Sequence, residues 1–174
     1  MAFILAADGG GTKTNFVLYN TAPAAQIDFM SFGTSSHEFL PGGYDEMRDK
    51  LNEMSGEILK KQNITSADIK YSVWGLAGLD TKSQYKTISA FIKGMGFKQF
   101  TLCNDSYLGV KAGLEGGSGI CLINGTGPNV VGINSKNAMF QMGGQFELTG
   151  DFAGGLLLGK EAIKTCFFNC LFAQ

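Results

Sequence analysis

Short apolar runs and glycine-rich turns alternate at the start of the chain. Residues 2–7 are apolar and stop at glycine soon afterwards, which predicts a buried strand. Residues 14–20 alternate more loosely between apolar and polar side chains, which predicts a hairpin partner for that strand. A third strand is predicted over 25–32. The first part of the chain is therefore expected to supply three consecutive strands to one sheet.

Two helices are predicted from apolar residues that recur every three or four positions, over 44–61 and 82–93. Each helix has a stripe that should face the core, with charged residues opposite in the first. The stripes are Tyr44, Met47, Leu51, Met54 and Ile58 in the first helix, and Tyr85, Ile88, Phe91 and Ile92 in the second.

Two more strands are predicted over 70–76 and 98–103, and a third helix over 106–114. Asn104-Asp105-Ser106 supplies the start signal for that helix, because Asp and Asn are favoured helix caps. The order β-β-β-α-β-α-β-α indicates an α/β domain over 1–117.

The same pattern begins again after residue 117. The segment 119–134 predicts a strand, a glycine-rich turn and a second strand, with a further strand over 138–142 and a helix over 155–171. Gly125 and Gly127 repeat the spacing of Gly9 and Gly11, which indicates an internal duplication. We expect 118–174 to be an incomplete second domain, so that the chain is an N-terminal portion of a longer unit.

Composition excludes several functional classes. The net charge of -1 provides no basic surface for nucleic acid, and no run of 18 apolar residues predicts a membrane span. The four cysteines form no Cys-x-x-Cys pair and no zinc spacing, which predicts buried free thiols in a cytoplasmic protein. The single histidine, His37, is expected to lie on a loop at the surface.

The turn after the first strand reads Asp8-Gly9-Gly10-Gly11-Thr12-Lys13. A hairpin needs one or two residues with positive φ, so three consecutive glycines exceed the structural requirement. Bare backbone lets an anion approach the N–H groups, which then form a concave phosphate site. The Thr12 hydroxyl and the Lys13 charge would assist, and Asp8 would hold Mg²⁺. An ordinary glycine-rich turn, with Asp8 bonded to local amides, is the alternative.

Three later segments favour the phosphate hypothesis. Gly125-Thr126-Gly127 repeats the turn at the symmetric position, and Gly78 belongs to a glycine motif that follows a strand. Asp105 could accept the proton of an attacking hydroxyl, as carboxylates do in kinases, or it could simply cap a helix. Two phosphate cradles that face each other, with two carboxylates, would suit phosphoryl transfer.

These motifs resemble one branch of the sugar kinase and actin superfamily, the N-acetylglucosamine kinases and BadF/BadG-type ATPases. The matching segments are DGGGTKT, GLAGLD, CNDSYLGVKAGL, INGTGPNVVG and GGQFELTGDFAGGLLLGKEAI. The resemblance implies ribonuclease H-like (actin-like ATPase) domains around ATP and Mg²⁺, with Asp105 as general base. It also implies substrate contacts from Ser36, Gly78, Gly144 and Asp151, besides Asp105.

Some positions depart from this family. Its N-acetylglucosamine kinases carry Gly-Gly-Trp-Gly-His where this chain has Gly143-Gly144-Gln145-Phe146-Glu147, and an asparagine where 33–37 has serines. The favoured function is a kinase of N-acetylglucosamine or a related sugar. The alternatives are an activator-type ATPase, with Cys166 and Cys170 near an iron–sulfur cluster, and an inactive nucleotide-binding remnant. We also expect a homo-oligomer formed through the apolar segment 155–172.

Overall fold

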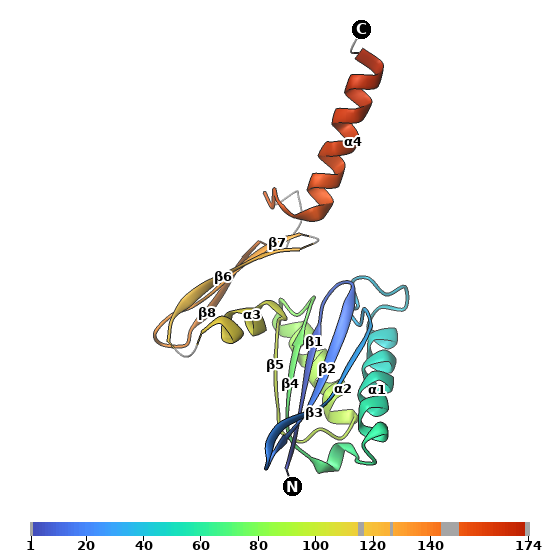
Figure 1. Cartoon of the computed structure of the whole chain (residues 1–174), viewed down its shortest axis with the longest axis vertical. Helices are drawn as coiled ribbons and strands as arrows, with labels where there is room; N and C mark the ends of the chain where they lie inside the picture. The colour runs from blue at the N-terminus through green and yellow to red at the C-terminus, as the bar shows by residue number, and fades with distance from the viewer. Residues whose placement is uncertain (1, 115–116, 126, 144–149, 173–174) are drawn as a thin grey trace. The chain divides into compact units, whose positions relative to one another are not determined.

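The computed structural model of this 174-residue chain describes residues 2–114, 117–125, 127–143 and 150–172. The chain divides into two compact units, Met1–Leu108 and Gly109–Gln174 (Figure 1). Within the described ranges, no helix has the length and hydropathy needed to cross a membrane.

The first unit is built on a five-stranded sheet with the order β3-β2-β1-β4-β5. The first three strands are antiparallel neighbours, whereas β4 and β5 run parallel to β1. Its strands are β1 (Phe3–Gly9), β2 (Lys13–Thr21), β3 (Ala24–Gly33), β4 (Ile69–Leu76) and β5 (Phe100–Cys103).

Three helices accompany this sheet, with a short 3-10 turn, η1 (Ser66–Asp68), before β4. Apolar residues of the first two helices share one core cluster with the inward side chains of the sheet. The indole of Trp74 lies at its centre, edge-on to Phe16 and Phe97, and its N–H donates to the Ser72 hydroxyl at 2.9 Å. The helices are α1 (Gly43–Lys61), α2 (Lys82–Gly94) and α3 (Ser106–Gly113).

The predicted stripe of α1 is confirmed, because Met47, Leu51, Met54 and Ile58 are buried. The stripe of α2 is only partly right. Ile88 and Ile92 are fully buried, but Tyr85 keeps 48% of its surface exposed. Tyr85 lies in the first turn of α2.

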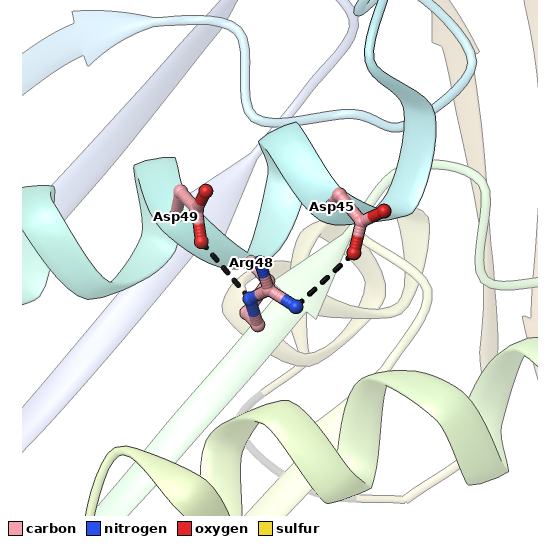
Figure 2. Close-up of polar contacts among 3 residues, drawn as sticks. All are labelled: Asp45, Arg48 and Asp49. Carbon is pink, nitrogen blue, oxygen red and sulfur yellow. Dashed lines mark hydrogen bonds and ion pairs between the residues drawn. The ribbon is translucent and has the colours of Figure 1, made fainter.

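The outer face of α1 carries exposed ion pairs. Figure 2 shows Arg48 between Asp45 and Asp49, with N–O distances of 3.1 and 2.9 Å. Ion pairs in this setting contribute little to stability, because water screens the charges. The fold of the first unit therefore rests on the core beneath α1.

The second unit contains a three-stranded antiparallel sheet with the order β6-β7-β8, followed by a long helix (Figure 1). The turn between the first two strands holds Gly125 and Gly127. The elements are β6 (Gly119–Asn124), β7 (Pro128–Ile133), β8 (Met139–Gly143) and α4 (Gly154–Phe172).

The second unit buries few apolar side chains. Val131 and Ile133 are buried, whereas α4 exposes apolar residues along its whole length. All four cysteines are free, as predicted, but the prediction of burial is wrong for Cys166 and Cys170, which lie exposed on α4. An apolar sequence alone does not bury a side chain when no neighbouring element packs against it.

Candidate functional site

The candidate site lies at the edge of the first sheet where β1, β4 and β5 end. The strand register places Asp8 beside Gly75, and Gly75 beside Cys103. Because parallel strands end at the same edge, the loops that follow all three strands emerge together. Those loops carry the first glycine turn (residues 9–13), the segment 77–81 and Asp105.

The predicted strand 2–7 extends further than expected, because β1 continues to Gly9. The backbone of Asp8 and Gly9 is paired on both sides, with Asn15 and Thr14 of β2 and with residues of β4. The Asp8 side chain is exposed. The sheet therefore fixes the base of the first glycine turn and holds its carboxylate at the edge.

Hydrogen bonds connect the first glycine turn to neighbouring segments. The Gly10 N–H donates to the Lys13 carbonyl at 2.9 Å, and the Gly9 carbonyl accepts the Ala77 N–H at 2.7 Å. The Thr34 hydroxyl donates to the Gly10 carbonyl at 3.1 Å. Loops from β3 and β4 thus clamp the turn from two sides.

Two backbone donors remain at the tip of this turn. Among the hydrogen bonds of the described residues, none uses the N–H of Gly11 or Thr12. Adjacent free N–H groups in a tight turn form a concave anion site. The first glycine turn therefore presents two adjacent backbone donors that no described residue uses.

Neighbouring side chains lie close to the backbone of Gly9 and Gly11. A Cβ on Gly9 would lie 2.7 Å from Leu76 Cδ2, and a Cβ on Gly11 would lie 2.9 Å from the Phe39 ring. A Cβ on Gly10 would lie 3.8 Å from Asp105 Oδ2. The bare backbone of Gly10 therefore faces the Asp105 carboxylate.

Asp105 is held at the start of α3 by a small polar network. Both the Asp105 and Asn104 side-chain oxygens accept the Ser106 N–H, at 2.9 and 3.0 Å. Asn104 is 4% exposed, and its amide donates to Asp80 Oδ1 at 3.0 Å. Asp105 directly precedes α3 but accepts only the adjacent N–H, and its second oxygen faces Gly10.

The pKa of Asp105 is raised to about 6, chiefly by burial and in smaller part by the charges of Asp8 and Asp80. The hydrogen bond from the Ser106 N–H works in the opposite direction. A carboxylate whose pKa lies near neutrality is suited to accept a proton. The neighbouring Cys103 is not a candidate nucleophile, because burial raises the pKa of its thiol to about 11.

The loop after β3 contributes two buried serine side chains. Ser35 is buried and accepts a hydrogen bond from the Thr14 hydroxyl at 2.9 Å. Ser36 is 1% exposed, and its hydroxyl has no partner among the described residues. An unpaired buried hydroxyl is costly, so a ligand that satisfies it gains affinity.

His37 lies in a loop, as predicted, but it is half-buried rather than fully at the surface. Its imidazole stacks on the Tyr44 ring at 4.2 Å, and its buried Nδ1 has no partner among the described residues. Gly78 has φ +74°, and a Cβ there would lie 2.7 Å from His37 Cε1. Sequence reasoning missed His37 because its stacking partner belongs to α1, in a different element.

The second glycine turn (residues 125–127) belongs to the second unit. The Gly125 N–H donates to the Gly127 carbonyl at 3.2 Å, and the Gly125 carbonyl accepts the Gly155 N–H of α4 at 2.8 Å. Asp151 lies near β8, since a Cβ on Gly143 would be 2.9 Å from its Oδ1. Thr126 and Gly144 lie outside the described residues, and the facing of the two turns stays a prediction.

Asp8 is the one residue that the sequence predicts as a metal ligand. No group of three His, Cys, Asp or Glu side chains with metal-ligand geometry occurs in the described part of the chain. Mg²⁺ commonly takes one or two carboxylates, several waters and substrate phosphates. The negative charges of Asp8 and Asp80 raise the pKa of Asp105. Neighbouring carboxylates of this kind fit a Mg²⁺ ion that takes one or two of them as ligands.

Known proteins share this arrangement of motifs. The model of the BadF/BadG/BcrA/BcrD ATPase family matches residues 7–166. The N-acetylmuramic acid/N-acetylglucosamine kinase of Clostridium acetobutylicum is 25% identical over 165 residues, which cover 94% of this chain and 53% of that protein. The chain spans about half the length of the curated relatives it matches.

Solved structures share the fold. A candidate N-acetylglucosamine kinase from Chromobacterium violaceum has a TM-score of 0.74 at 20% identity, over 97% of this chain and 58% of that one. MreB5 of Spiroplasma citri, solved with ADP, has a TM-score of 0.59 at 11% identity, over 99% and 58%. The predicted actin-like ATPase fold, with the order βββαβαβα, is therefore confirmed.

Proposed function

Because the chain belongs to the BadF/BadG/BcrA/BcrD ATPase family, we propose that it transfers a phosphoryl group from ATP to a hydroxyl of a small sugar. One observation carries this proposal: the Asp105 carboxylate faces the bare backbone of Gly10 in the first glycine turn. A proton acceptor and a phosphate cradle then lie side by side. Phosphoryl transfer requires those two groups to be close together.

The two glycine turns are the proposed nucleotide-binding elements. The first contains Gly9, Gly10 and Gly11; its unused donors are the N–H groups of Gly11 and Thr12, and Thr12 and Lys13 add a hydroxyl and a positive charge. In the second, the corresponding residues are Gly125, Thr126 and Gly127. The free N–H groups of Gly11 and Thr12 support the assignment for the first turn.

Asp105 is the proposed general base. Its carboxylate takes the proton of the sugar hydroxyl while the hydroxyl oxygen forms a bond to the γ-phosphorus, and ADP leaves with the bridging oxygen. Asp8 would hold Mg²⁺, which neutralises phosphate charge when it is bound. The position of Asp8 at the end of β1 supports this role.

The proposed substrate is N-acetylglucosamine or a related sugar. Two of the similar proteins carry N-acetylglucosamine kinase in their names. The unpartnered Ser36 hydroxyl supports a polar ligand next to the glycine turn. We assign substrate contacts to Ser36, Gly78, Asp105, Gly144 and Asp151.

The second unit supports two further parts of the proposal. Three antiparallel strands followed by a helix repeat the order of β1, β2, β3 and α1, so residues 118–174 would begin a second ribonuclease H-like domain. The exposed apolar side chains of α4 favour self-association through 155–172.

The test is ADP release by the protein expressed from its complete gene, with ATP, Mg²⁺ and N-acetylglucosamine. We expect ADP release that depends on the sugar. Asp105→Asn should retain ATP binding, measured by calorimetry, and lose turnover by about 10²–10⁴-fold.

Two results would count against the proposal. Equal ADP release with and without the sugar would indicate an ATPase rather than a kinase. Full turnover in Asp105→Asn would leave Asp105 with its structural role at the start of α3 alone. The matched control is Asp45→Asn on the outer face of α1, which removes the same charge from an exposed side chain.

A further inference from the structure

A separate groove lies at the opposite end of the first sheet. It has a volume of about 760 Å³ and runs between α2 and the chain around the start of β5. The first glycine turn follows the end of β1, and β5 runs in the same sense as β1, so the two features occupy different ends of the sheet. The residues that the argument uses are Tyr71, Tyr85, Lys86, Ser89, Lys93 and Lys98.

The lining of this groove is positively charged. Lys86, Lys93 and Lys98 line it, and no aspartate or glutamate does. None of the three takes part in an ion pair within the described residues. The whole chain has 15 acidic and 14 basic residues, so this local excess of lysine is not a consequence of composition.

Ser89, a residue with a buried hydroxyl, lines the same groove. Ser89 is 9% exposed, and its Oγ has no hydrogen-bond partner among the described residues. Ser89 lies three positions after Lys86 and four before Lys93, so the three side chains share one face of α2. Buried hydroxyls normally find a partner, and an anion at this face would supply one.

Aromatic rings complete the groove. Tyr71 and Tyr85 are 37% and 48% exposed, which leaves ring surface open to a ligand. The Tyr71 hydroxyl is fixed by a contact with the Thr101 hydroxyl at 2.8 Å. Rings of this kind pack against flat ligands, and the volume lies within the range of small-molecule sites.

We propose that this groove binds an organic phosphate monoester that carries a planar ring. The lysines and the Ser89 hydroxyl take the phosphate, and the tyrosines take the ring. The site is independent of the kinase reaction proposed above, because it uses none of the residues of the first glycine turn. Its binding should weaken as salt rises, since the lysines are exposed and their charges are screened.

The test is a titration of the ¹⁵N-labelled chain with phenyl phosphate, followed by amide NMR. We expect the resonances of Tyr85, Lys86 and Ser89 to shift together in a saturable way. Inorganic phosphate lacks the ring and phenol lacks the charge, so each should bind more weakly than phenyl phosphate. Signals of the first glycine turn report separately on phosphate bound there.

Variants identify the groups that bind. Lys86→Ala should weaken phenyl phosphate by about fivefold, from the loss of one charge-assisted contact. Lys82→Ala is the matched control, because it removes the same charge from the same helix and does not line the groove. Ser89→Ala should also weaken binding, and without ligand it should raise the melting temperature by removing an unpaired hydroxyl.

Three outcomes would overturn the proposal. The first is the absence of saturable shifts at α2 with phenyl phosphate. The second is equal weakening by Lys82→Ala and Lys86→Ala, which would indicate general charge attraction. The third is phenol binding as tightly as phenyl phosphate, which would indicate a purely apolar groove.

Discussion

The two glycine turns of this chain have similar sequences and different surroundings. Around the first turn, Leu76, Phe39 and Asp105 lie within 4 Å of where side chains on its glycines would begin. Around Gly125 and Gly127, no described residue lies within that distance. The first turn is therefore surrounded by side chains of its own unit, whereas the glycines of the second turn have open space beside them. Two turns of similar sequence therefore differ in chemistry, because tertiary packing places other side chains beside the first one.

The hydrophobic cores of the two units also differ, because the first unit buries its large apolar side chains and the second exposes many of them. The first unit has Trp74, Phe16 and Leu51 fully buried between one face of the sheet and its helices. In the second unit, Val131 and Ile133 are buried while Phe167 and Phe168 are each 65% exposed. The packed core of the first unit thus holds its site residues in place. Differences between the two units in activity, association and stability test this contrast.

The largest effect is expected from the protonation of Asp105. A base must be deprotonated, so turnover in the proposed kinase reaction should rise with pH and level off above the pKa of about 6. At one pH unit below that pKa, turnover should be about tenfold lower than at the plateau. Asp151→Asn, in the second unit, should raise the KM for the sugar and leave the pH midpoint unchanged. A pH profile that is flat between 5 and 7 would contradict this role.

Stability provides an independent readout of the same group. The folded-state pKa of Asp105 is raised above its unfolded value of 3.8, so its contribution to stability is present at low pH and lost as pH rises through about 6. Asp105→Asn should therefore raise the melting temperature at pH 7 and change it little at pH 4. An equal shift at both pH values would point to a cause other than charge.

The second prediction concerns the mass of this chain in solution. Its monomer mass is 18.6 kDa, and self-association through α4 should give at least twice that value by light scattering at high concentration. Replacing Phe167 and Phe168 by Asp should restore the monomer mass, because charges oppose the burial of that surface. Phe29→Asp is the control, since Phe29 is 51% exposed in the first unit. A monomeric mass for the parent chain would refute the association.

The third prediction compares alanine at equivalent glycines. A Cβ on Gly9 would lie 2.7 Å from Leu76 Cδ2 and 3.0 Å from Ser35 Oγ. Gly9→Ala should destabilise the fold by about 1–3 kcal/mol through overpacking. Gly125→Ala, in open space among the described residues, should change stability by less than about 0.5 kcal/mol. Chemical denaturation measures both, and equal effects would remove the contrast between the turns.

The smallest effects are expected where the two units are alike. Arg48 pairs with Asp45 and Asp49 on α1, and Lys164 pairs with Glu161 on α4, all on exposed surfaces. Arg48→Ala and Lys164→Ala should each leave the denaturation midpoint within experimental error, because water screens these charges. A clear decrease in the denaturation midpoint of either variant would show that the side chain stabilises the fold through packing as well as through its ion pair.

Hydrophobic periodicity was sufficient to predict the elements. Strands and helices occur where alternation and helical spacing place them, including α4 at Gly154–Phe172 for a predicted 155–171. Errors arose at positions whose environment depends on another element. Tyr85 fits a helical stripe but is largely exposed, and Cys166 and Cys170 lie in an apolar segment but are also exposed.

The candidate site was predicted in part. The glycines, Asp8 and Asp105 were identified because their types and spacing are unusual for ordinary turns. His37 was not, because its stacking on Tyr44 and its approach to Gly78 link three segments of the chain. The groove beside α2 was also missed, since its lysines and tyrosines come from separate elements.

The sequence by itself determined the order of elements, the two glycine turns and the carboxylates at the ends of strands, because these depend on local periodicity and backbone freedom. Only the tertiary structure decided which groups meet: that Asp105 faces Gly10, that its pKa rises to about 6, and that Ser36 and Ser89 keep unpaired hydroxyls. Burial and proximity arise when distant segments pack together, and neither is a property of any one segment.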